Sequence, residues 1–532
     1  MTTIKNHHID PPSLNYLYFI SFIEGGVVMV TELAGARLLA PFFGASLYSW
    51  ASTLSITLLA LMTGYYFGGY VTTKKHFKSP TAIIWLLLLS GLFVLLLPVI
   101  SKSIMESTLH LSFFTGLIVS QMLFLFPPIF LMGMMSPMII FQITHSVEQA
   151  GRSAGNIYAI STFGGILFTM GFGFGIIPNY GITLSLTVLG IFVVLLGLFF
   201  LIRRRIAVVK TVVVVFVIII STWEAINHYT NPKELLHPSE RLVKKSEGLM
   251  GEIRITDLRQ RTPQGEPFYS RKLEVNNMLQ NLVLKDYPTV SLTYYVTFIR
   301  SLIGQLPQNE TALLIGLGGG SIYSDAKLYG TDIETVEIDQ RIYDYGLKYF
   351  GMEDHPEKNT ITDGRYFINT VDKQYDYIIL DAVVGESAAG QLLTKESFRK
   401  LYQMLPENGT LIIEHGGIMD FSSNSLTPSI YKTLEAVGFN VSMYNPMQTK
   451  TFGDVVFIAT KNDTFKKEAI FIAQDFLLRG GPMIDYEVSN SDFDETKAVV
   501  LTDDRNKTDI LLRPHFISIR NSARQNLKTL AK

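Results

Sequence analysis

The sequence of 532 residues contains no cysteine and carries almost no net charge. Without cysteine, disulfide frameworks, thiolate metal sites and cysteine nucleophiles are all excluded. The 45 basic and 46 acidic residues nearly cancel, so neither a nucleic-acid partner nor a polybasic surface is indicated. The 10 histidines are scattered along the chain, and we therefore expect no metal site.

Charged residues are scarce in the N-terminal part of the chain. Within residues 14–72 only Glu24, Glu32 and Arg37 are charged, whereas residues 230–532 have an ordinary globular composition. The opening segment MTTIKNHHIDPPSLN is polar and no cleavage site follows the first apolar run, so we expect no removable signal peptide. The composition therefore predicts a two-part protein, with a membrane half followed by a soluble half.

Long apolar runs predict seven or eight membrane-spanning helices. Runs of about 18 or more apolar residues are typical of such helices, because lipid leaves the backbone no hydrogen-bond partner except itself. The fourth run is long, and Pro127-Pro128 can split it into two shorter spans, so the count stays open. The candidate runs are residues 15–40, 47–71, 81–100, 109–143, 155–177, 182–202 and 206–223.

Basic residues between these runs bear on the topology. Lys74, Lys75 and Lys78 form one basic loop and residues 203–205 form another, and the positive-inside rule puts both in the cytoplasm. With that choice, seven spans place the soluble half outside, whereas eight spans put one basic cluster on the wrong side. The charges alone therefore leave the orientation open.

The three charges of the first apolar run need a partner or a cavity, because a charge is costly in hydrocarbon. Glu24 and Glu32 are about two helical turns apart, so both lie near one face of a helix. Two alternatives stay open: a structural ion pair, such as Glu32 with Arg37, and a path for substrate or protons. The glycine-rich segments GYYFGGY (64–70) and GFGFG (171–175) favour close approach of helices.

The soluble half shows a regular alternation of predicted strands and helices. Short strands are predicted within residues 250–285, in GEIRITDLRQ and RKLEVNNMLQ. Further on, TALLIGL precedes SIYSDAKLYG, DIETVEID precedes QRIYDYGLKYF, and YDYIILD precedes KESFRKLYQML. This alternation predicts a mainly parallel sheet with helices on both faces, a Rossmann-like α/β domain with a small β-subdomain before it.

A glycine cluster follows the first strand of this alternation. Gly316, Gly318, Gly319 and Gly320 stand between strand and helix, where missing side chains let the backbone turn tightly and approach a ligand. Glu337 ends the next strand about twenty residues later, where a carboxylate accepts hydrogen bonds from a ribose diol. The pair predicts a nucleoside site.

Two more carboxylates end later strands. Asp363, in ITDGRYF, is suited to accept a hydrogen bond from an adenine amino group, and Asp381 ends YIILD. Ligands of open parallel sheets bind beyond the carboxyl ends of the strands, so these groups are predicted to converge on one crevice. The sequence thus predicts an adenosine-containing ligand with Asp381 nearest the reacting end.

These segments resemble the spermidine synthase (polyamine aminopropyltransferase) family, a branch of the class I S-adenosylmethionine-dependent fold, over residues 245–460. GGGS at 318–321 resembles the family's GGGD, VEID matches directly, and TDGRYF resembles its GDGR-x-F/Y. The spacing from Asp381 to Thr394 equals that in the family's DSSDPxGPAxxLFTxEFY. The segments ELAGARLLAPFFGASLYSW, MGMMSPM and GRSAGNIYAISTFGGILF, and VLTDD at 500–504, resemble bacterial proteins that fuse several spans to such a domain.

The resemblance implies roles for individual residues. Asp381 matches the aspartate that deprotonates the attacking amine in the family. The residues implied to bind the cofactor are Gln280, Gly316, Gly318, Gly319, Gly320, Glu337, Ile338, Asp363 and Gly364.

The acceptor region departs from the family's pattern. Ser321 replaces the GGGD aspartate that helps hold the amine of the aminopropyl group, and Val384 replaces the second aspartate of DSSDP, which binds the diamine. Each lost charge-assisted hydrogen bond is worth about 1.5–3 kcal/mol, so putrescine is not expected to be the natural acceptor. The residues implied to contact substrate are Ser321, Tyr294, Tyr295, Val384 and Glu386.

The resemblance implies a membrane-integrated transferase. It would move an aminopropyl or other alkyl group from decarboxylated S-adenosylmethionine or S-adenosylmethionine to an amine-type or lipid-borne acceptor. Two alternatives stay open: a methyltransferase or lyase that uses S-adenosylmethionine, and a transporter or sensor whose soluble domain binds the nucleoside without chemistry. Both cofactors are made in the cytoplasm, so we expect the soluble half there, the helices in the bacterial inner membrane, and a homodimer.

The same reading predicts five segments along the chain. They are an N-terminal tail (1–13), a transmembrane helical domain (14–225), a linker with the small β-subdomain (226–290), the Rossmann-like catalytic domain (291–465) and a C-terminal extension (466–532).

Overall fold

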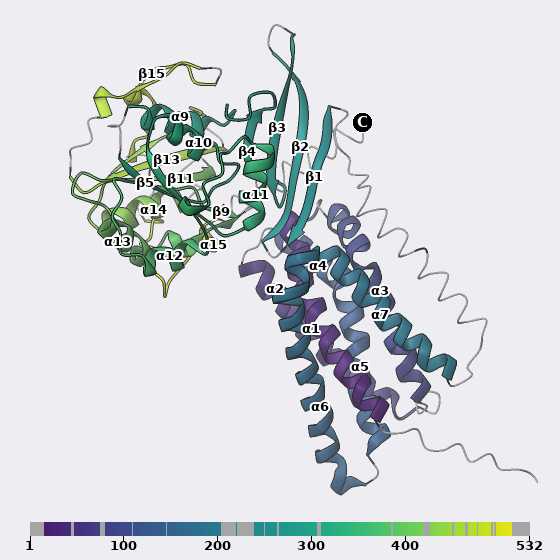
Figure 1. The fold of residues 1–532 in the computed structure, drawn as a ribbon. Coiled ribbons are helices and arrows are strands. Elements are labelled where there is room, and N and C mark those ends of the chain that lie inside the picture. Colours follow the sequence, from purple (N-terminus) through teal and green to yellow (C-terminus); the bar gives the residue numbers. More distant parts are fainter. Residues whose placement is uncertain are drawn as a thin grey trace, which may run out of the picture. The chain divides into compact units, whose positions relative to one another are not determined.

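The fold consists of two compact units, one made of apolar helices and one built around β-sheets (Figure 1). We describe each unit by itself. The computed structural model describes residues 15–43, 47–74, 80–108, 110–144, 146–203, 220, 239–248, 250–262, 265–305, 310–384, 387–418, 426–449, 452–462, 467–475, 477–490, 493 and 496–512.

The helical unit begins with helices that coincide with the predicted apolar runs. Its elements are α1 (Asn15–Phe43), α2 (Leu47–Val71), α3 (Pro80–Ser107), α4 (Phe113–Phe124), α5 (Phe126–Ile143), α6 (Val147–Met170), the π-helical turn η2 (Gly171–Ile176) and α7 (Ile177–Arg203).

Five helices in the described part of the chain are long and apolar enough to cross a membrane. The last of them, Val147–Arg203, spans 57 residues and is broken at Gly181, whose φ of 77° and ψ of 171° are not helical. The predicted run 206–223 lies outside the described residues except for residue 220. The predicted count of seven or eight spans is therefore not confirmed.

The fourth predicted run forms two helices rather than one. α4 ends at Phe124, and α5 begins at Phe126, so that Pro127 lies in the first helical turn, where proline is tolerated. With 12 residues, α4 is about 18 Å long, which is too short for a hydrocarbon core of about 30 Å. Only α5 of this pair qualifies as a span.

Glycines allow α2 and α5 to pack closely. A side chain at Gly64 would come within 2.6 Å of the Phe130 carbonyl oxygen, and one at Gly68 would collide with the Met134 backbone. The prediction for GYYFGGY is thus confirmed. It is wrong for GFGFG, because the space beside Gly171 and Gly175 is open and the segment forms the π-helical turn instead.

The charged residues of α1 have different surroundings. The guanidinium of Arg37 lies 5.9 Å from the centroid of the Trp50 ring, and its Nε has no hydrogen-bond partner among the described residues. Arg37 thus packs against an aromatic ring rather than forming the ion pair with Glu32 that the sequence suggested. Glu24 is only 2% exposed and accepts hydrogen bonds from the Ser136 and Ser161 hydroxyls.

The second unit contains a seven-stranded mixed sheet in the order β12-β13-β11-β8-β5-β6-β7. The five strands from β11 to β7 are parallel, and β13 runs antiparallel to both β11 and β12. The strands are β5 (Thr311–Ile315), β6 (Asp332–Glu337), β7 (Asn359–Ile361), β8 (Tyr377–Leu380), β11 (Thr410–Ile418), β12 (Asn440–Tyr444) and β13 (Phe452–Thr460).

Helices cover both faces of this sheet, with α9 and α10 on one side and α12 and α13 on the other (Figure 1). The central strands β5 and β8 are apolar except for Thr311 at the start of β5, as expected for parallel strands that are buried on both faces. The helices are α9 (Tyr294–Ile303), α10 (Ser321–Leu328), α11 (Gln340–Tyr349), α12 (Gly364–Thr370), α13 (Lys395–Met404) and α14 (Leu426–Glu435).

A four-stranded antiparallel sheet precedes the mixed sheet and shares its core. Leu273 and Val283 of this sheet belong to the same buried cluster as Phe298 of α9 and Leu314 of β5. The small β-subdomain is therefore one wall of the larger unit. Its strands are β1 (Glu240–Gly248), β2 (Gly251–Arg261), β3 (Pro267–Val275) and β4 (Met278–Leu284).

The C-terminal segment 496–512 packs back against α12, α13 and α14. Arg365 donates to Asp503 (Nη2 to Oδ2, 2.7 Å), and the Thr394 hydroxyl donates to the same carboxylate at 2.7 Å. Leu501 forms two backbone contacts, since its carbonyl accepts from Lys395 N and its N–H donates to Thr433 Oγ1. The remaining short elements are β9 (Val383–Val384), β10 (Ser387–Ala388), β14 (Phe471–Ile472), β15 (Gly481–Pro482), α15 (Thr508–Leu511) and the 3-10 turns η3 (Pro356–Lys358), η4 (Gly390–Leu392), η5 (Lys467–Ala469) and η6 (Met483–Tyr486).

Candidate active site

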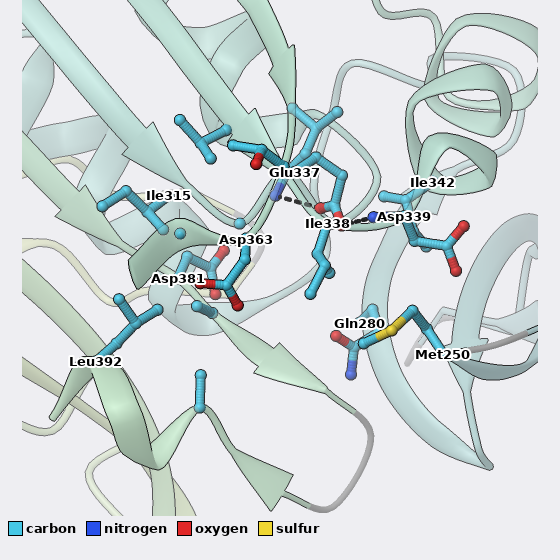
Figure 2. Close-up of a pocket in the computed structure, with 18 of the residues that line it drawn as sticks. Met250, Gln280, Ile315, Glu337, Ile338, Asp339, Ile342, Asp363, Asp381 and Leu392 are labelled. Atoms are coloured by element: carbon cyan, nitrogen blue, oxygen red, sulfur yellow. Dashed lines mark hydrogen bonds between the residues drawn. The ribbon is translucent and has the colours of Figure 1, made fainter. Parts of the chain in front are cut away.

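A cleft lies at the carboxyl edge of the parallel strands, on both sides of the β5–β8 pair (Figure 2). The strand order reverses at this pair, and such switch points are where open α/β sheets bind ligands. The cleft opens to solvent, and all the space between its walls, including the open part, measures about 690 Å³. Its walls include Gln280, Gly316, Gly318, Glu337, Ile338, Asp363, Gly364 and Asp381, together with Met250, Asp339, Gln391 and Leu392.

The turn after β5 is held tightly against β8. Gly316 has φ +91°, and a side chain on it would collide with the Asp381 carbonyl. Its N–H donates to the Val336 carbonyl at 2.8 Å, and the Asp381 N–H donates to the Ile315 carbonyl at 2.9 Å. Gly318, with φ +55°, meets no atom closer than 3.5 Å at its missing side chain, so the backbone there leaves room for a ligand.

Glu337 connects the two turns that border the cleft. Its Oε2 accepts from Leu317 N and its Oε1 from Asp339 N, both at 2.9 Å (Figure 2). Burial raises its pKa to about 7 against the lowering effect of these backbone hydrogen bonds. Each carboxylate oxygen has two lone pairs, so the side chain keeps acceptor capacity for hydroxyl groups of a ligand.

Asp363 begins α12 as its N-cap. Its Oδ1 accepts from Tyr366 N at 2.9 Å, which fixes the side chain at the cleft. Figure 2 shows its carboxylate beside that of Asp381, with Ile315 and Leu392 nearby and with Gln280 and Met250 on the opposite wall. The second oxygen of Asp363 is thus near the space that a ligand would fill.

Asp381 follows β8 directly and is hydrogen-bonded to a tyrosine. The Tyr295 hydroxyl donates to Asp381 Oδ2 at 3.3 Å. Burial raises the pKa of Asp381 to about 7, with a contribution from the negative charges of Asp454 and Glu337, while the Tyr295 hydrogen bond lowers it. A carboxylate with such a pKa is suited to accept a proton near neutral pH.

Two further carboxyl groups lie next to Asp381, and the sequence analysis assigned neither. Burial and the charges of Asp381 and Asp454 raise the pKa of Glu414, which is 9% exposed, well above its usual value. Burial raises the pKa of Asp454 to about 6. Within the described residues, no lysine or arginine forms an ion pair with any of the three. Glu414 stands in the segment NGTLIIE and Asp454 in FGDVVFIAT.

Three residues of the GGGS segment point away from the cleft. Ser321 is 5% exposed and exchanges two hydrogen bonds with the Asn281 side chain, at 2.9 and 3.1 Å. A side chain on Gly319 would collide with Asn281, and one on Gly320 would meet Met352. These residues shape the start of α10 rather than line the space for a ligand.

The other residues implied to contact substrate have mixed positions. Tyr294 packs against the hydrophobic core, whereas its neighbour Tyr295 reaches Asp381. Val384 lies in β9, which forms a two-stranded hairpin with β10 beside the cleft residue Ala389. Glu386 lies outside the described residues. In the described part of the chain, no group of three or more His, Cys, Asp or Glu side chains is arranged to hold a metal ion.

Part of this unit is similar to a known protein family. Residues 293–471 match the family model of the spermine/spermidine synthase domain. The sheet unit contains a spermidine synthase-like domain. Its match starts at α9, includes the cleft residues after β5, β6, β7 and β8, and continues through β13.

Several characterised proteins are similar to the spermidine synthase-like domain. A polyamine aminopropyltransferase of Vibrio vulnificus is 34% identical over 129 residues, which is 22% of this chain and 42% of that protein. An N-terminal histidine N-methyltransferase of Emericella nidulans is 34% identical over 132 residues, 24% of this chain and 23% of that protein. The chain therefore spans less than half of the length of these relatives.

Two solved structures are similar to this chain at lower identity. The spermidine synthase of Thermotoga maritima is 15% identical, with a TM-score of 0.36, over 47% of this chain and 85% of that one. A probable spermidine synthase of Corynebacterium glutamicum is 14% identical, with a TM-score of 0.35, over 43% of this chain and 82% of that one.

Proposed function

We propose that the protein is a membrane-integrated transferase that moves an aminopropyl or other alkyl group from an adenosyl sulfonium to an amine. The donor is decarboxylated S-adenosylmethionine or S-adenosylmethionine, and Asp381 is the proton acceptor. The observation that carries the proposal is the acidic group formed by Asp381, Glu414 and Asp454, which has no cation partner among the described residues and lies at the cleft beyond the ends of the parallel strands.

The cleft residues fit such a donor. The backbone at Gly318 leaves room for close approach, Glu337 offers free lone pairs for ribose hydroxyls, and Asp363 has an oxygen available for an adenine amino group. Ile338 and Leu392 supply apolar walls for a base. When bound, the sulfonium supplies an activated carbon, whose bond to sulfur breaks as the acceptor nitrogen attacks and leaves a neutral thioether.

The acidic group selects a cationic acceptor. These three neighbouring carboxyl groups have no cation beside them in the part of the chain that the structure describes, so their negative charges repel one another. A nearby positive charge would stabilise the charged form of each. A protonated amine supplies that charge and is attracted into the cleft. Glu414 and Asp454 would then replace the two aspartates that the family has at the positions of Ser321 and Val384.

Asp381 then acts on the bound amine. An ammonium nitrogen has no free lone pair, so it must lose a proton before it attacks the carbon in line with the breaking bond. With a pKa of about 7, Asp381 is charged in a large fraction of molecules at neutral pH and receives that proton. Tyr295 orients the carboxylate through its hydrogen bond and keeps one oxygen occupied.

The apolar helices and the cytoplasmic source of the donor support a location and an orientation for the protein in the cell. Helices such as α2, with Leu58 65% and Tyr66 72% exposed, present apolar side chains outward as lipid-facing helices do. Both donors are made in the cytoplasm, so the sheet unit is proposed to face it, with the helices in the bacterial inner membrane. The predicted boundaries at 226–290, 291–465 and 466–532, contact with membrane lipids, a lipid-borne acceptor and a homodimer remain part of this proposal.

Methyl transfer is the second candidate, and Ser321 favours it. The side chain of Ser321 is neutral and already bonded to Asn281, so it offers no carboxylate to the amine of an aminopropyl group. A methyl group needs no such contact. The similarity to an N-methyltransferase points in the same direction.

Mass spectrometry of the nucleoside product distinguishes these reactions. The purified full-length protein is incubated with each labelled donor and a mixture of amines. 5′-Methylthioadenosine with an aminopropylated amine is the expected outcome, whereas S-adenosylhomocysteine with a methylated amine supports the second candidate. If either donor binds but is never consumed, the protein is a transporter or sensor and the proposal is wrong.

A further inference from the structure

A second cavity, open on one side, lies entirely within the helical unit, between α1, α2 and α6. It measures about 430 Å³, within the range of about 300–1,000 Å³ that is usual for ligand pockets. Its walls are mainly apolar side chains and the small residues that let α1 and α6 approach. The lining residues are Glu24, Gly25, Val28, Met29, Leu61, Tyr65, Ser161, Thr162, Gly165, Ile166, Thr169 and Met170.

Glu24 is the single acidic residue of this wall. The Ser136 and Ser161 hydroxyls both donate to its Oε2, each at 3.2 Å. Neither bond involves Oε1, which accepts no hydrogen bond from the described residues. The two serines fix the carboxylate on α1 and leave its second oxygen for a ligand in the cavity.

The remaining polar groups of the wall are hydroxyls. Tyr65 lines the cavity with its ring packed edge to face against Tyr158, at a centroid distance of 6.2 Å. The Thr169 hydroxyl is buried without a hydrogen-bond partner among the described residues. No lysine, arginine or histidine is among the lining residues, so the wall itself has nothing to balance a charged Glu24.

We propose that this cavity binds an amphiphilic amine, with its ammonium group at Glu24 Oε1 and its apolar body along α2 and α6. A buried carboxylate in an apolar wall is stabilised by a cation that can also donate hydrogen bonds, and an ammonium does both. The ring of Tyr65 adds a favourable surface for a cation. The apolar remainder of the wall excludes a small hydrophilic ion as occupant, because such an ion would lose its hydration without replacement.

The site is independent of the proposed transfer reaction, since it needs neither a donor nor the sheet unit's cleft. The test therefore measures binding alone. The full-length protein, in phosphatidylcholine nanodiscs without nucleoside, is titrated with dodecylamine, and bound ligand is counted by native mass spectrometry. Dodecanol and dodecyl sulfate, with the same chain length, serve as the neutral and anionic competitors.

Saturable dodecylamine binding that dodecanol and dodecyl sulfate do not displace is the expected result. Glu24→Gln keeps the shape and removes the charge, and should weaken binding about tenfold or more. Glu32→Gln, on the same helix but outside the cavity, should leave binding unchanged. Thr162→Phe fills the cavity with every charge intact and should also abolish binding.

Two results would overturn the proposal. If dodecanol competes as well as the amine, the cavity takes lipid chains without regard to charge. If Glu24→Gln binds dodecylamine like the wild type, the carboxylate is not the recognition group. Should Glu24→Gln fail to fold, unchanged binding by Thr162→Phe still refutes the cavity as the binding site.

Discussion

The helical unit and the sheet unit both bury carboxyl groups, but they hold them in different ways. In the helical unit a single carboxylate, Glu24, is bonded by two serine hydroxyls from neighbouring helices. In the sheet unit, Asp381, Glu414 and Asp454 lie together without a cation among the described residues, and the Tyr295 hydroxyl donates a hydrogen bond to Asp381.

The difference reflects the geometry of the two folds. Side chains on packed helices meet in pairs along a groove, so a lone carboxylate there is readily surrounded by small hydroxyl residues. The ends of adjacent strands meet in a row at one edge, so a sheet can gather several carboxylates where a ligand enters. In the first arrangement two hydroxyls hold one oxygen of the carboxylate, whereas in the second the neighbouring carboxyl groups raise one another's pKa.

The largest expected effect concerns the base of the sheet unit. Asp381→Asn should lower the rate of product formation about 10²–10⁴-fold, because the amine loses its proton acceptor. Affinity for the donor should change less than about threefold, a difference that a single-turnover assay with calorimetry measures. Asp325→Asn is the control, since burial raises the pKa of Asp325 to about 7 as well but this residue is outside the cleft. A variant at Asp381 with full activity would contradict the assignment.

Glu337 should matter for binding rather than turnover. Glu337→Ala removes the acceptor for ribose hydroxyls and releases two backbone N–H groups, and should weaken nucleoside binding about 10–100-fold. Calorimetry with 5′-methylthioadenosine and S-adenosylhomocysteine measures the loss. Glu334→Ala, in the same strand but bonded to Lys373 and Tyr375 away from the cleft, should bind normally. Equal losses in both variants would mean a general effect on the fold.

The acidic group should determine the affinity for the amine. Glu414→Gln and Asp454→Asn should each raise the KM for a cationic acceptor about tenfold, because each removes one charge that the ammonium neutralises. The donor affinity of the same variants is the control and should not change. If both variants keep the wild-type KM, the carboxyl groups do not recognise the acceptor.

The helical unit offers a matched pair of glycines to test its packing. Gly68→Val should destabilise the protein by about 1–3 kcal/mol, since the new side chain meets the Met134 backbone of α5. Gly69→Val should be nearly neutral, because the adjacent position has open space. Thermal melting of the full chain in detergent compares the two. Equal melting temperatures would show that α2 and α5 are not in close contact.

The smallest expected effect is a dependence of stability on pH. The folded protein keeps protons on Asp381 and Glu337 up to about pH 7, whereas the unfolded chain loses them near pH 4. The folded state thus binds more protons between these values, so the stability contributed by both groups is complete below about pH 4 and is lost as the pH rises through about 7. As the pH rises through this window, the melting temperature of the wild type should fall relative to that of Asp381→Asn, so the gap between the two widens in favour of the variant. A constant gap would argue against the raised pKa.

Much of the fold could be predicted because its signals are local. An apolar run of sufficient length specifies a membrane helix wherever it lies, and α1, α2 and α3 follow the predicted runs closely. The strand-helix alternation and the polar residue after each strand are equally local, and the structure brings Gly318, Glu337, Asp363 and Asp381 to one cleft. Their roles toward a ligand stay predictions.

The missed residues depend on contacts between distant segments. Asp454 lies near the start of β13, which runs antiparallel to β11. Because Asp454 pairs with Gly416 of β11, it lies at the same edge of the sheet as Glu414. A rule about the ends of parallel strands cannot find it. Ser321 stands in the right motif, but the direction of its side chain is set by Asn281, forty residues away. The GFGFG segment is rich in glycine, as segments at helix–helix contacts often are. Its composition does not specify, however, whether another helix packs against it.

The C-terminal segment has a practical consequence for anyone who wishes to produce the sheet unit alone. The family match stops at residue 471, yet Asp503 accepts hydrogen bonds from Arg365 and Thr394, and Leu501 connects the start of α13 with the last turns of α14. A protein fragment that ended at residue 471 would lack these contacts with α12 and α13, the helices that follow the loops of the cleft. An expression clone should therefore run past Leu512.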